Sequence, residues 1–127
     1  IGGMADRLGF KGMLTEGADH ILGWRSPNYL YRHPENGLKL LLKNYKLSDD
    51  IAFRFSDPNW NQRPLMADKF VHWLNAVPPC EQVVNLFMDY ETFGEHQWAE
   101  SGIFEFLYAL PGRVLNHSSY HFSTPSE

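Results

Sequence analysis

Cysteine, basic runs and long apolar runs are all scarce in this sequence of 127 residues. Cys80 is its only cysteine, which excludes an intrachain disulfide and a zinc site built from several cysteines. Fifteen acidic residues outnumber eleven basic ones, so the net charge is −4, which argues against a groove for nucleic acid. No apolar run is long enough to span a membrane, and no signal peptide is visible. We therefore expect a cytoplasmic protein without a nucleic acid or a membrane as partner.

Hydrophobic and aromatic residues, by contrast, are plentiful. The hydrophobic fraction of 43% is enough for a packed core, and the length fits one ordinary domain. The aromatic fraction is 15%. This exceeds what a small core usually needs and fits a site that stacks flat ligands, although an aromatic-rich core is the simpler alternative.

The most informative stretch is residues 83–96, which begins apolar and β-prone and ends in three carboxylates and a histidine. An apolar run that ends in acids is typical of a buried strand that delivers side chains to a site. Because side chains alternate along a strand, Asp89 and Glu91 continue the face that carries Asn85. We therefore predict a strand from Val83 with a functional end. The alternative is a solvated strand end followed by a polar turn.

Two further strands are predicted, at residues 10–15 and 38–45, and the first of them ends at Glu16. Four helices are predicted, at residues 1–8, 48–55, 64–77 and 101–110. Ser48 is the expected cap of the second helix, Pro64 is expected in the first turn of the third, and Pro111-Gly112 is expected to end the fourth. The resulting β/α alternation favours parallel strands with helices outside, as in part of a (β/α) barrel. Three strands are too few for a complete barrel.

Two of the predicted strands end in an acid, Glu16 and Asp89, and parallel β/α folds hold their reactive groups at such strand ends. Paired carboxyl groups are the usual requirement for cleaving a glycosidic bond, one to attack or stabilise the anomeric carbon and one to protonate the leaving oxygen. The long loop at residues 17–37 has the composition of a functional loop. Its aromatic side chains can stack on sugar rings and its polar ones can hydrogen-bond hydroxyl groups, as His96 also can. The residues predicted to bind substrate are His20, Trp24, Arg25, Tyr29, Glu91 and His96.

A metal centre is the rival interpretation of the acidic stretch. Its possible ligands are Asp89, Glu91, Glu95 and His96, with His20 as a further candidate. However, the sequence has no His-x-His or His-Glu-x-x-His arrangement. It also has no Gly-x-Ser-x-Gly motif and no Gly-rich phosphate loop. We therefore predict a reaction that uses no metal and no cofactor.

Two segments resemble signature motifs of the α-amylases of glycoside hydrolase family 57. They are residues 12–25, Gly-Met-Leu-Thr-Glu-Gly-Ala-Asp-His-Ile-Leu-Gly-Trp-Arg, and residues 86–96, Leu-Phe-Met-Asp-Tyr-Glu-Thr-Phe-Gly-Glu-His. The resemblance implies an incomplete (β/α)7 barrel that acts on α-glucans with retention of anomeric configuration. It also implies that Glu16 is the nucleophile and Asp89 the acid/base, the two acids already selected by their positions. Glu91 is expected to support Asp89 from the same face.

Two alternatives remain open at this point. The same catalytic pair serves transfer to another sugar, as in a glucan transferase or branching enzyme. The chain can also be a carbohydrate-binding or structural piece without turnover. The family's earlier motifs, a His-Gln-Pro and a strand that bears a Glu, have no counterpart here. We therefore expect residues 1–127 to be the central part of a longer catalytic barrel that carries both catalytic acids.

Overall fold

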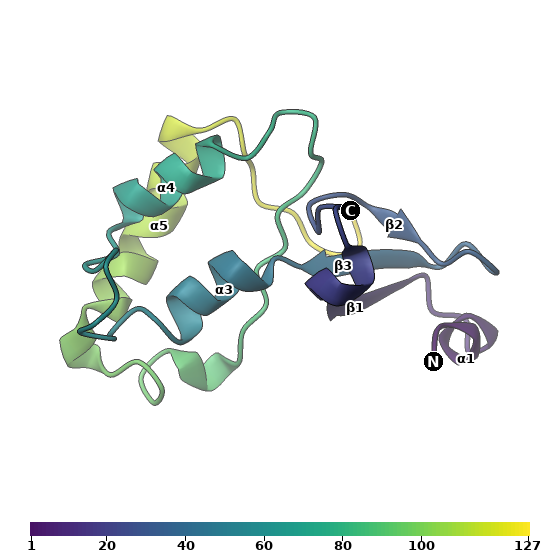
Figure 1. The fold of residues 1–127 in the computed structure, drawn as a ribbon, viewed down its shortest axis with the longest axis horizontal. Helices are drawn as coiled ribbons and strands as arrows, with labels where there is room; N and C mark the ends of the chain where they lie inside the picture. Colours follow the sequence, from purple (N-terminus) through teal and green to yellow (C-terminus); the bar gives the residue numbers. More distant parts are fainter. The chain divides into compact units, whose positions relative to one another are not determined.

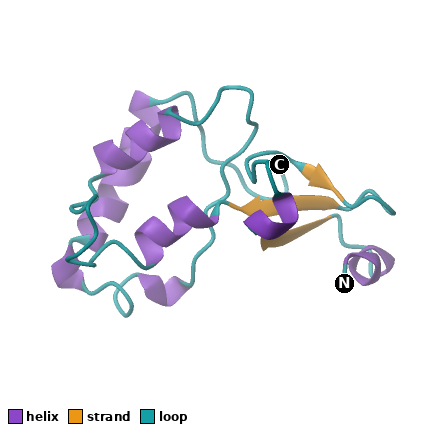
Figure 2. Ribbon diagram, in the orientation of Figure 1, coloured by secondary structure: helices purple, strands orange, loops and turns teal.

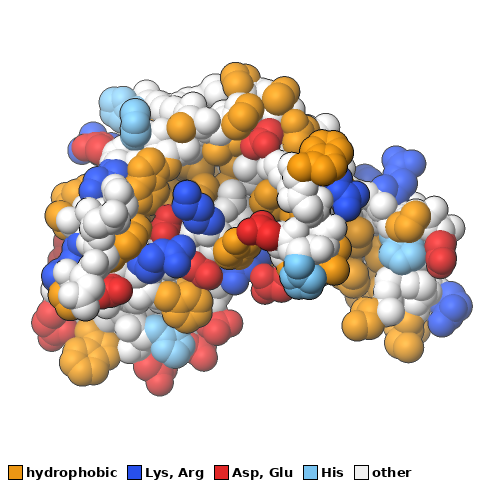
Figure 3. Space-filling model, viewed as in Figure 1, with side chains coloured by type: hydrophobic (Ala, Val, Ile, Leu, Met, Phe, Trp, Pro, Cys, Tyr) orange, Lys and Arg blue, Asp and Glu red, His pale blue; other side chains and the backbone are white.

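The computed structural model describes all 127 residues and separates them into two compact units (Figures 1 and 2). The first unit comprises Ile1–Ser48, Pro79–Phe87 and Pro125–Glu127. The second comprises Asp49–Pro78 and Met88–Thr124. None of the helices has both the length and the apolar character needed to cross a membrane. Large apolar side chains are exposed in both units, and part of this exposed apolar surface is visible in Figure 3.

The first unit is built on a three-stranded mixed sheet with the strand order β1-β3-β2. β1 runs parallel to β3, with Glu16 opposite Lys43, and the two-residue β2 runs antiparallel to β3. The parallel arrangement predicted from the sequence is therefore present between the strands expected at residues 10–15 and 38–45. The antiparallel strand β2 was not predicted. The elements of this unit are α1 (Gly2–Arg7), β1 (Gly12–Glu16), α2 (Asp19–Leu22), β2 (Tyr31–Arg32) and β3 (Lys39–Lys43).

The predicted strands at residues 10–15 and 38–45 are both present, although each is shorter than expected. Leu38, just before β3, and Leu42 within it are both buried, and β3 is the central strand of the sheet. The face of β1 that carries Leu14 and Glu16 is exposed. The loop predicted at residues 17–37 is not entirely irregular, since it contains α2 and β2.

The strand predicted from Val83 is absent, and only Asn85 forms a parallel bridge, to Lys43 of β3. Two competing hydrogen-bond patterns account for this. The Asn85 side chain donates from Nδ2 to the carbonyl oxygen of Leu42 at 3.0 Å, a bond that replaces a ladder contact. The backbone N–H groups of Gln82 and Val83 both donate to the carbonyl oxygen of Asn28. Apart from the bridge at Asn85, residues 83–89 therefore have no strand partner.

The second unit is helical, and its core is aromatic. Phe70 of α4 is fully buried and packs edge-on against Phe106 of α5, with ring centroids 5.8 Å apart. Phe55 packs against the same Phe106 ring at 5.3 Å. At the surface, Asn75 Nδ2 donates to the carbonyl oxygen of His117 at 2.9 Å. The helical elements are α3 (Tyr45–Ala52), which begins in the first unit, α4 (Ala67–Asn75), the 3₁₀ turns η1 (Tyr90–Thr92) and η2 (Ala99–Ser101), and α5 (Ile103–His117).

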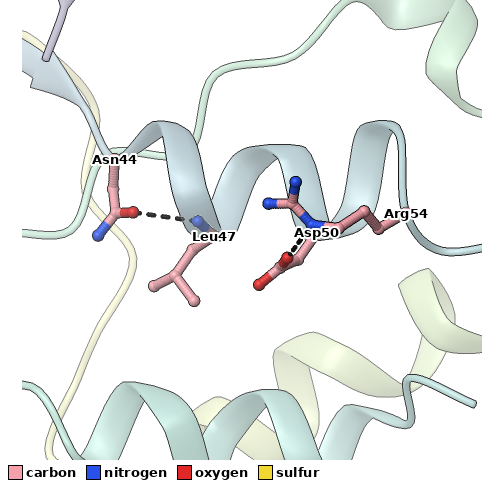
Figure 4. A network of polar contacts seen from close by, with 4 residues as sticks. All are labelled: Asn44, Leu47, Asp50 and Arg54. Atoms are coloured by element: carbon pink, nitrogen blue, oxygen red, sulfur yellow. Dashed lines mark hydrogen bonds and ion pairs between the residues drawn. The ribbon is translucent and has the colours of Figure 1, made fainter. Parts of the chain in front are cut away.

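Ser48 does not cap α3, because that helix begins three residues earlier, at Tyr45. The side chain of Asn44 caps it instead, with Oδ1 accepting from the Leu47 N–H at 3.1 Å (Figure 4). Ser48 is buried, and its hydroxyl accepts from the backbone N–H of Phe87. Just beyond the helix, Arg54 Nε lies 2.6 Å from Oδ1 of Asp50, which belongs to α3.

Two other predicted helix boundaries are also wrong. α4 begins at Ala67, three residues after Pro64, and Met66 is its extended and exposed N-terminal neighbour. α5 continues through Pro111 to His117. Although Pro111 lacks an N–H group, Leu110 and Val114 are buried on either side of it. Their burial keeps the helix continuous across the proline.

Replacing Gly17 by Ala should destabilise the first unit. A Cβ atom at Gly17 would lie 2.4 Å from the backbone carbonyl oxygen of Lys43 and 2.9 Å from Cβ of Pro27. Overpacking of this kind costs about 1–3 kcal/mol, which urea unfolding would detect. Gly112→Ala is the matched control, because nothing lies near its Cβ and an Ala inside α5 should stabilise by about 0.5–1 kcal/mol. Equal stability of the two variants would contradict the close approach at Gly17.

Candidate functional site

Glu16 stands at the carboxyl end of β1, where the sequence predicted a reactive acid. Its side chain is 70% exposed, so its carboxylate is accessible to a ligand. Lys43 Nζ lies 3.8 Å from Glu16 Oε1, from the neighbouring parallel strand. An ion pair this exposed contributes at most about 1 kcal/mol to stability, so its main effect is to place a positive charge beside the carboxylate. The role of Lys43 was missed because the sequence did not give the strand register.

The residues that follow β1 supply three predicted substrate contacts. His20 lies in the short helix α2 and is exposed. Trp24 follows α2 and is 94% exposed, which leaves its ring free to stack on a flat partner. Arg25 donates from Nε to the carbonyl oxygen of Leu22 and from Nη2 to that of Ile21. Arg25 therefore stabilises the end of α2 while its remaining N–H groups stay exposed.

Tyr29 is half-buried, and its hydroxyl lies 3.5 Å from the sulfur of Cys80. The hydrogen bond with Cys80 is the main reason why the pKa of Tyr29 is raised above its ordinary value. Tyr29, like any tyrosine at neutral pH, keeps its phenolic proton and can both donate and accept hydrogen bonds.

A buried polar network near Tyr29 was missed by the sequence analysis. Asn28 is buried, and its Nδ2 donates to Glu81 Oε2 at 2.9 Å while its Oδ1 accepts from Asn44 Nδ2 at 3.0 Å. These bonds join the loop before β2 to residues 81–83 and to the end of β3. Isolated asparagines carry no periodic signal, so no pattern in the sequence pointed to this network.

Asp89, Glu91 and His96 form a tight cluster in the second unit. Asp89 directly precedes η1, Glu91 lies within it, and the N–H groups of Glu95 and His96 both donate to the carbonyl oxygen of Glu91 at 3.2 and 3.0 Å. This turn brings one carboxylate oxygen from each acid and one imidazole nitrogen to within 4.8 Å of one another. All three side chains are exposed, and Glu95 is not part of the cluster. Such a group can share a proton or bind a cation.

Two buried polar residues hold the Asp89 turn in place. Thr92 donates its N–H to the carbonyl oxygen of Asp89 at 3.0 Å, and the Gln97 N–H donates to the carbonyl oxygen of Thr92 at 2.9 Å. Gln97 Nε2 also donates to the carbonyl oxygen of Ala52, at 2.9 Å. Within the turn, Gly94 has φ +111°, and a Cβ there would lie 3.3 Å from the Phe104 ring. The turn is thus held by backbone hydrogen bonds, by the Gln97 side chain and by packing contacts.

The structure therefore brings together three of the eight predicted site residues, Asp89, Glu91 and His96. It places Glu16, His20, Trp24, Arg25 and Tyr29 in the first unit. Because Glu16 and Asp89 belong to different units, their pairing stays a prediction.

Comparison with known proteins identifies the family. The profile described as "Glycosyl hydrolase family 57" matches residues 1–127, and the chain belongs to that family. The resemblance found in the two sequence motifs is thereby confirmed. Among curated proteins, the chain is 55% identical over 127 residues to one from Methanocaldococcus jannaschii that is named "Putative alpha-amylase". The match covers 100% of this chain and 27% of that relative. No solved structure gives a significant match.

Proposed function

We propose that the chain carries the catalytic pair of a retaining glycoside hydrolase that cleaves α-1,4-glucosidic bonds in starch- or glycogen-type glucans. The observation that carries the proposal is the exposed carboxylate of Glu16 at the end of β1, in a chain that belongs to glycosyl hydrolase family 57. The name of the relative from M. jannaschii supports an α-glucan as substrate. Both acids lie in the segments whose motifs resemble those of the family's α-amylases.

In this proposal, Glu16 attacks the anomeric carbon and forms a glycosyl-enzyme, while Asp89 protonates the leaving oxygen. Asp89 then removes a proton from water, which attacks the anomeric carbon and releases Glu16. The nearby carboxylate of Glu91 and imidazole of His96 position Asp89 or contact the sugar. The nucleophile and the acid/base are both side chains of the chain itself, and the reaction involves no cofactor.

The remaining predicted residues supply sugar contacts. The exposed ring of Trp24 stacks on a glucose unit, and Tyr29, His20 and Arg25 hydrogen-bond hydroxyl groups. The parallel strands β1 and β3 are two neighbouring strands of an incomplete (β/α)7 barrel, with Glu16 at its carboxyl-terminal mouth. Transfer to a second sugar instead of water uses the same two acids, and the identity of the acceptor distinguishes it from hydrolysis.

The stereochemistry of the first product tests this proposal. The longest natural form of the chain, incubated with a maltooligosaccharide, should release the α-anomer first, because two displacements restore the original configuration. Proton NMR recorded before mutarotation distinguishes the two anomers. Release of the β-anomer would overturn double displacement, as would carboxyl groups separated by roughly 6.5–9.5 Å instead of about 5–5.5 Å in a substrate-bound crystal structure.

A further inference from the structure

We propose that Asp89, Glu91 and His96 form a binding site for a divalent transition-metal ion of the Zn²⁺ type, and that the bound ion inhibits the enzyme. Binding of the ion rests on the geometry of the turn alone. Its inhibitory effect rests on the proposed function of Asp89 as proton donor.

The three side chains offer a donor set that suits Zn²⁺. Zinc is commonly bound by histidine nitrogen and carboxylate oxygen, with three protein ligands and a fourth position left open to water. Calcium and magnesium prefer an all-oxygen shell, so the imidazole of His96 favours a transition metal over either of them. The two carboxylates also balance the two positive charges of the ion.

The ligand atoms are already close to the required separation. They lie within 4.8 Å of one another, whereas the ligands of a tetrahedral zinc site with bonds of about 2.0–2.1 Å lie roughly 3.3 Å apart. Because all three side chains are exposed, rotation about their side-chain bonds can close this difference without moving the core.

The backbone that presents the ligands is already ordered. The carbonyl oxygen of Glu91 accepts hydrogen bonds from the N–H groups of both Glu95 and His96. These bonds close a short turn that brings His96 back beside the acids. Buried Thr92 and Gln97 connect this turn to the helical unit. Metal binding therefore has to restrict three side chains only, instead of ordering a flexible loop.

An ion at this site would oppose the proposed chemistry directly. Coordination occupies one carboxylate oxygen of Asp89, and the positive charge of the ion disfavours protonation of the other, so Asp89 can no longer supply the proton that the leaving group needs. No bond of the protein is broken, and removal of the ion by a chelator restores the free carboxyl group. Zinc here is therefore a reversible inhibitor and not a cofactor.

Direct binding of Zn²⁺ tests the site independently of activity. Isothermal titration of the purified chain with zinc chloride should reveal one site that Asp89→Asn, Glu91→Gln and His96→Gln each weaken by about tenfold or more. Glu95→Gln is the matched control, since it removes a neighbouring carboxylate that lies outside the cluster. His117→Gln controls for an exposed histidine elsewhere. Circular dichroism spectra verify that each variant keeps its fold.

Two results would overturn the site: no saturable Zn²⁺ binding, or binding that Glu95→Gln weakens as much as Glu91→Gln. Inhibition is then measured on the longest natural form of the chain, with EDTA added to reverse it and Ca²⁺ as a comparison ion. Loss of turnover that tracks occupancy of the site supports both parts of the proposal. Binding without inhibition supports the metal site but overturns the role of Asp89 as proton donor.

Discussion

Glu16→Gln should reduce turnover of α-glucans by on the order of 10⁴-fold or more, because it removes the proposed nucleophile while changing the side-chain shape very little. The variant is made in the longest natural form of the chain, and kcat is measured with a maltooligosaccharide. The fold should be unaffected, since the Glu16 side chain is 70% exposed and its ion pair with Lys43 is long. Glu95→Gln, which also removes one exposed carboxylate, should retain activity.

The matching substitution Asp89→Asn separates the two catalytic roles. Loss of a general acid/base costs about 10²–10⁴-fold with a natural glucan. With an aryl glucoside, whose leaving group needs no protonation, Asp89→Asn should still form the glycosyl-enzyme, and azide should accelerate its breakdown. Glu16→Gln should show neither behaviour. If azide rescued Glu16→Gln with retention of configuration, or if Glu16→Gln kept full activity, the proposed assignment of roles would be wrong.

Phe70→Ala should destabilise the second unit by about 3–5 kcal/mol, the usual cost of truncating a buried phenylalanine. Phe70 is 0% exposed and contacts the rings of both Phe106 and Trp73, with centroid separations of 5.8 and 6.3 Å. Because domains are stable by only about 5–15 kcal/mol, a loss of this size is a large part of the total. Urea unfolding followed by tryptophan fluorescence measures it, since Trp73 lies against the altered position.

Phe53→Ala provides the control for this prediction. Phe53 lies in the same unit but is 66% exposed, so its truncation should change stability by no more than about 0.5 kcal/mol. A similar loss for both variants would indicate that the aromatic cluster of Phe55, Phe70 and Phe106 is not the core of this unit.

The elements that the sequence predicted correctly are those whose apolar pattern is strong and local. Leu38 and Leu42 in and beside β3, and Phe70 and Leu74 of α4, recur at strand or helix spacing and are buried. The predicted helix boundaries were wrong where one side chain determines where the helix begins or ends. Asn44 caps α3 in place of Ser48, and burial of Val114 carries α5 beyond Pro111.

In the candidate site, too, local features were predicted from the sequence and contacts between distant segments were not. The sequence grouped Asp89, Glu91, Glu95 and His96 from their proximity along the chain, and in the structure three of them, Asp89, Glu91 and His96, lie together while Glu95 lies outside the cluster. It did not predict how they are presented, because a strand at residues 83–89 was expected where Asn85 bonds to Leu42 through its side chain. The pairing of Lys43 with Glu16 depends on the register between β1 and β3, and register between distant segments has no signature within either one.

The hydrogen bond from Gln97 Nε2 to the carbonyl oxygen of Ala52 has a consequence for engineering. It connects the turn that presents Asp89 to the carboxyl end of α3, so a helix holds this turn, whereas in parallel β/α folds such acids usually project from a strand. A designer who wishes to redirect Asp89 without altering it can therefore work at Gln97 and leave the sheet untouched.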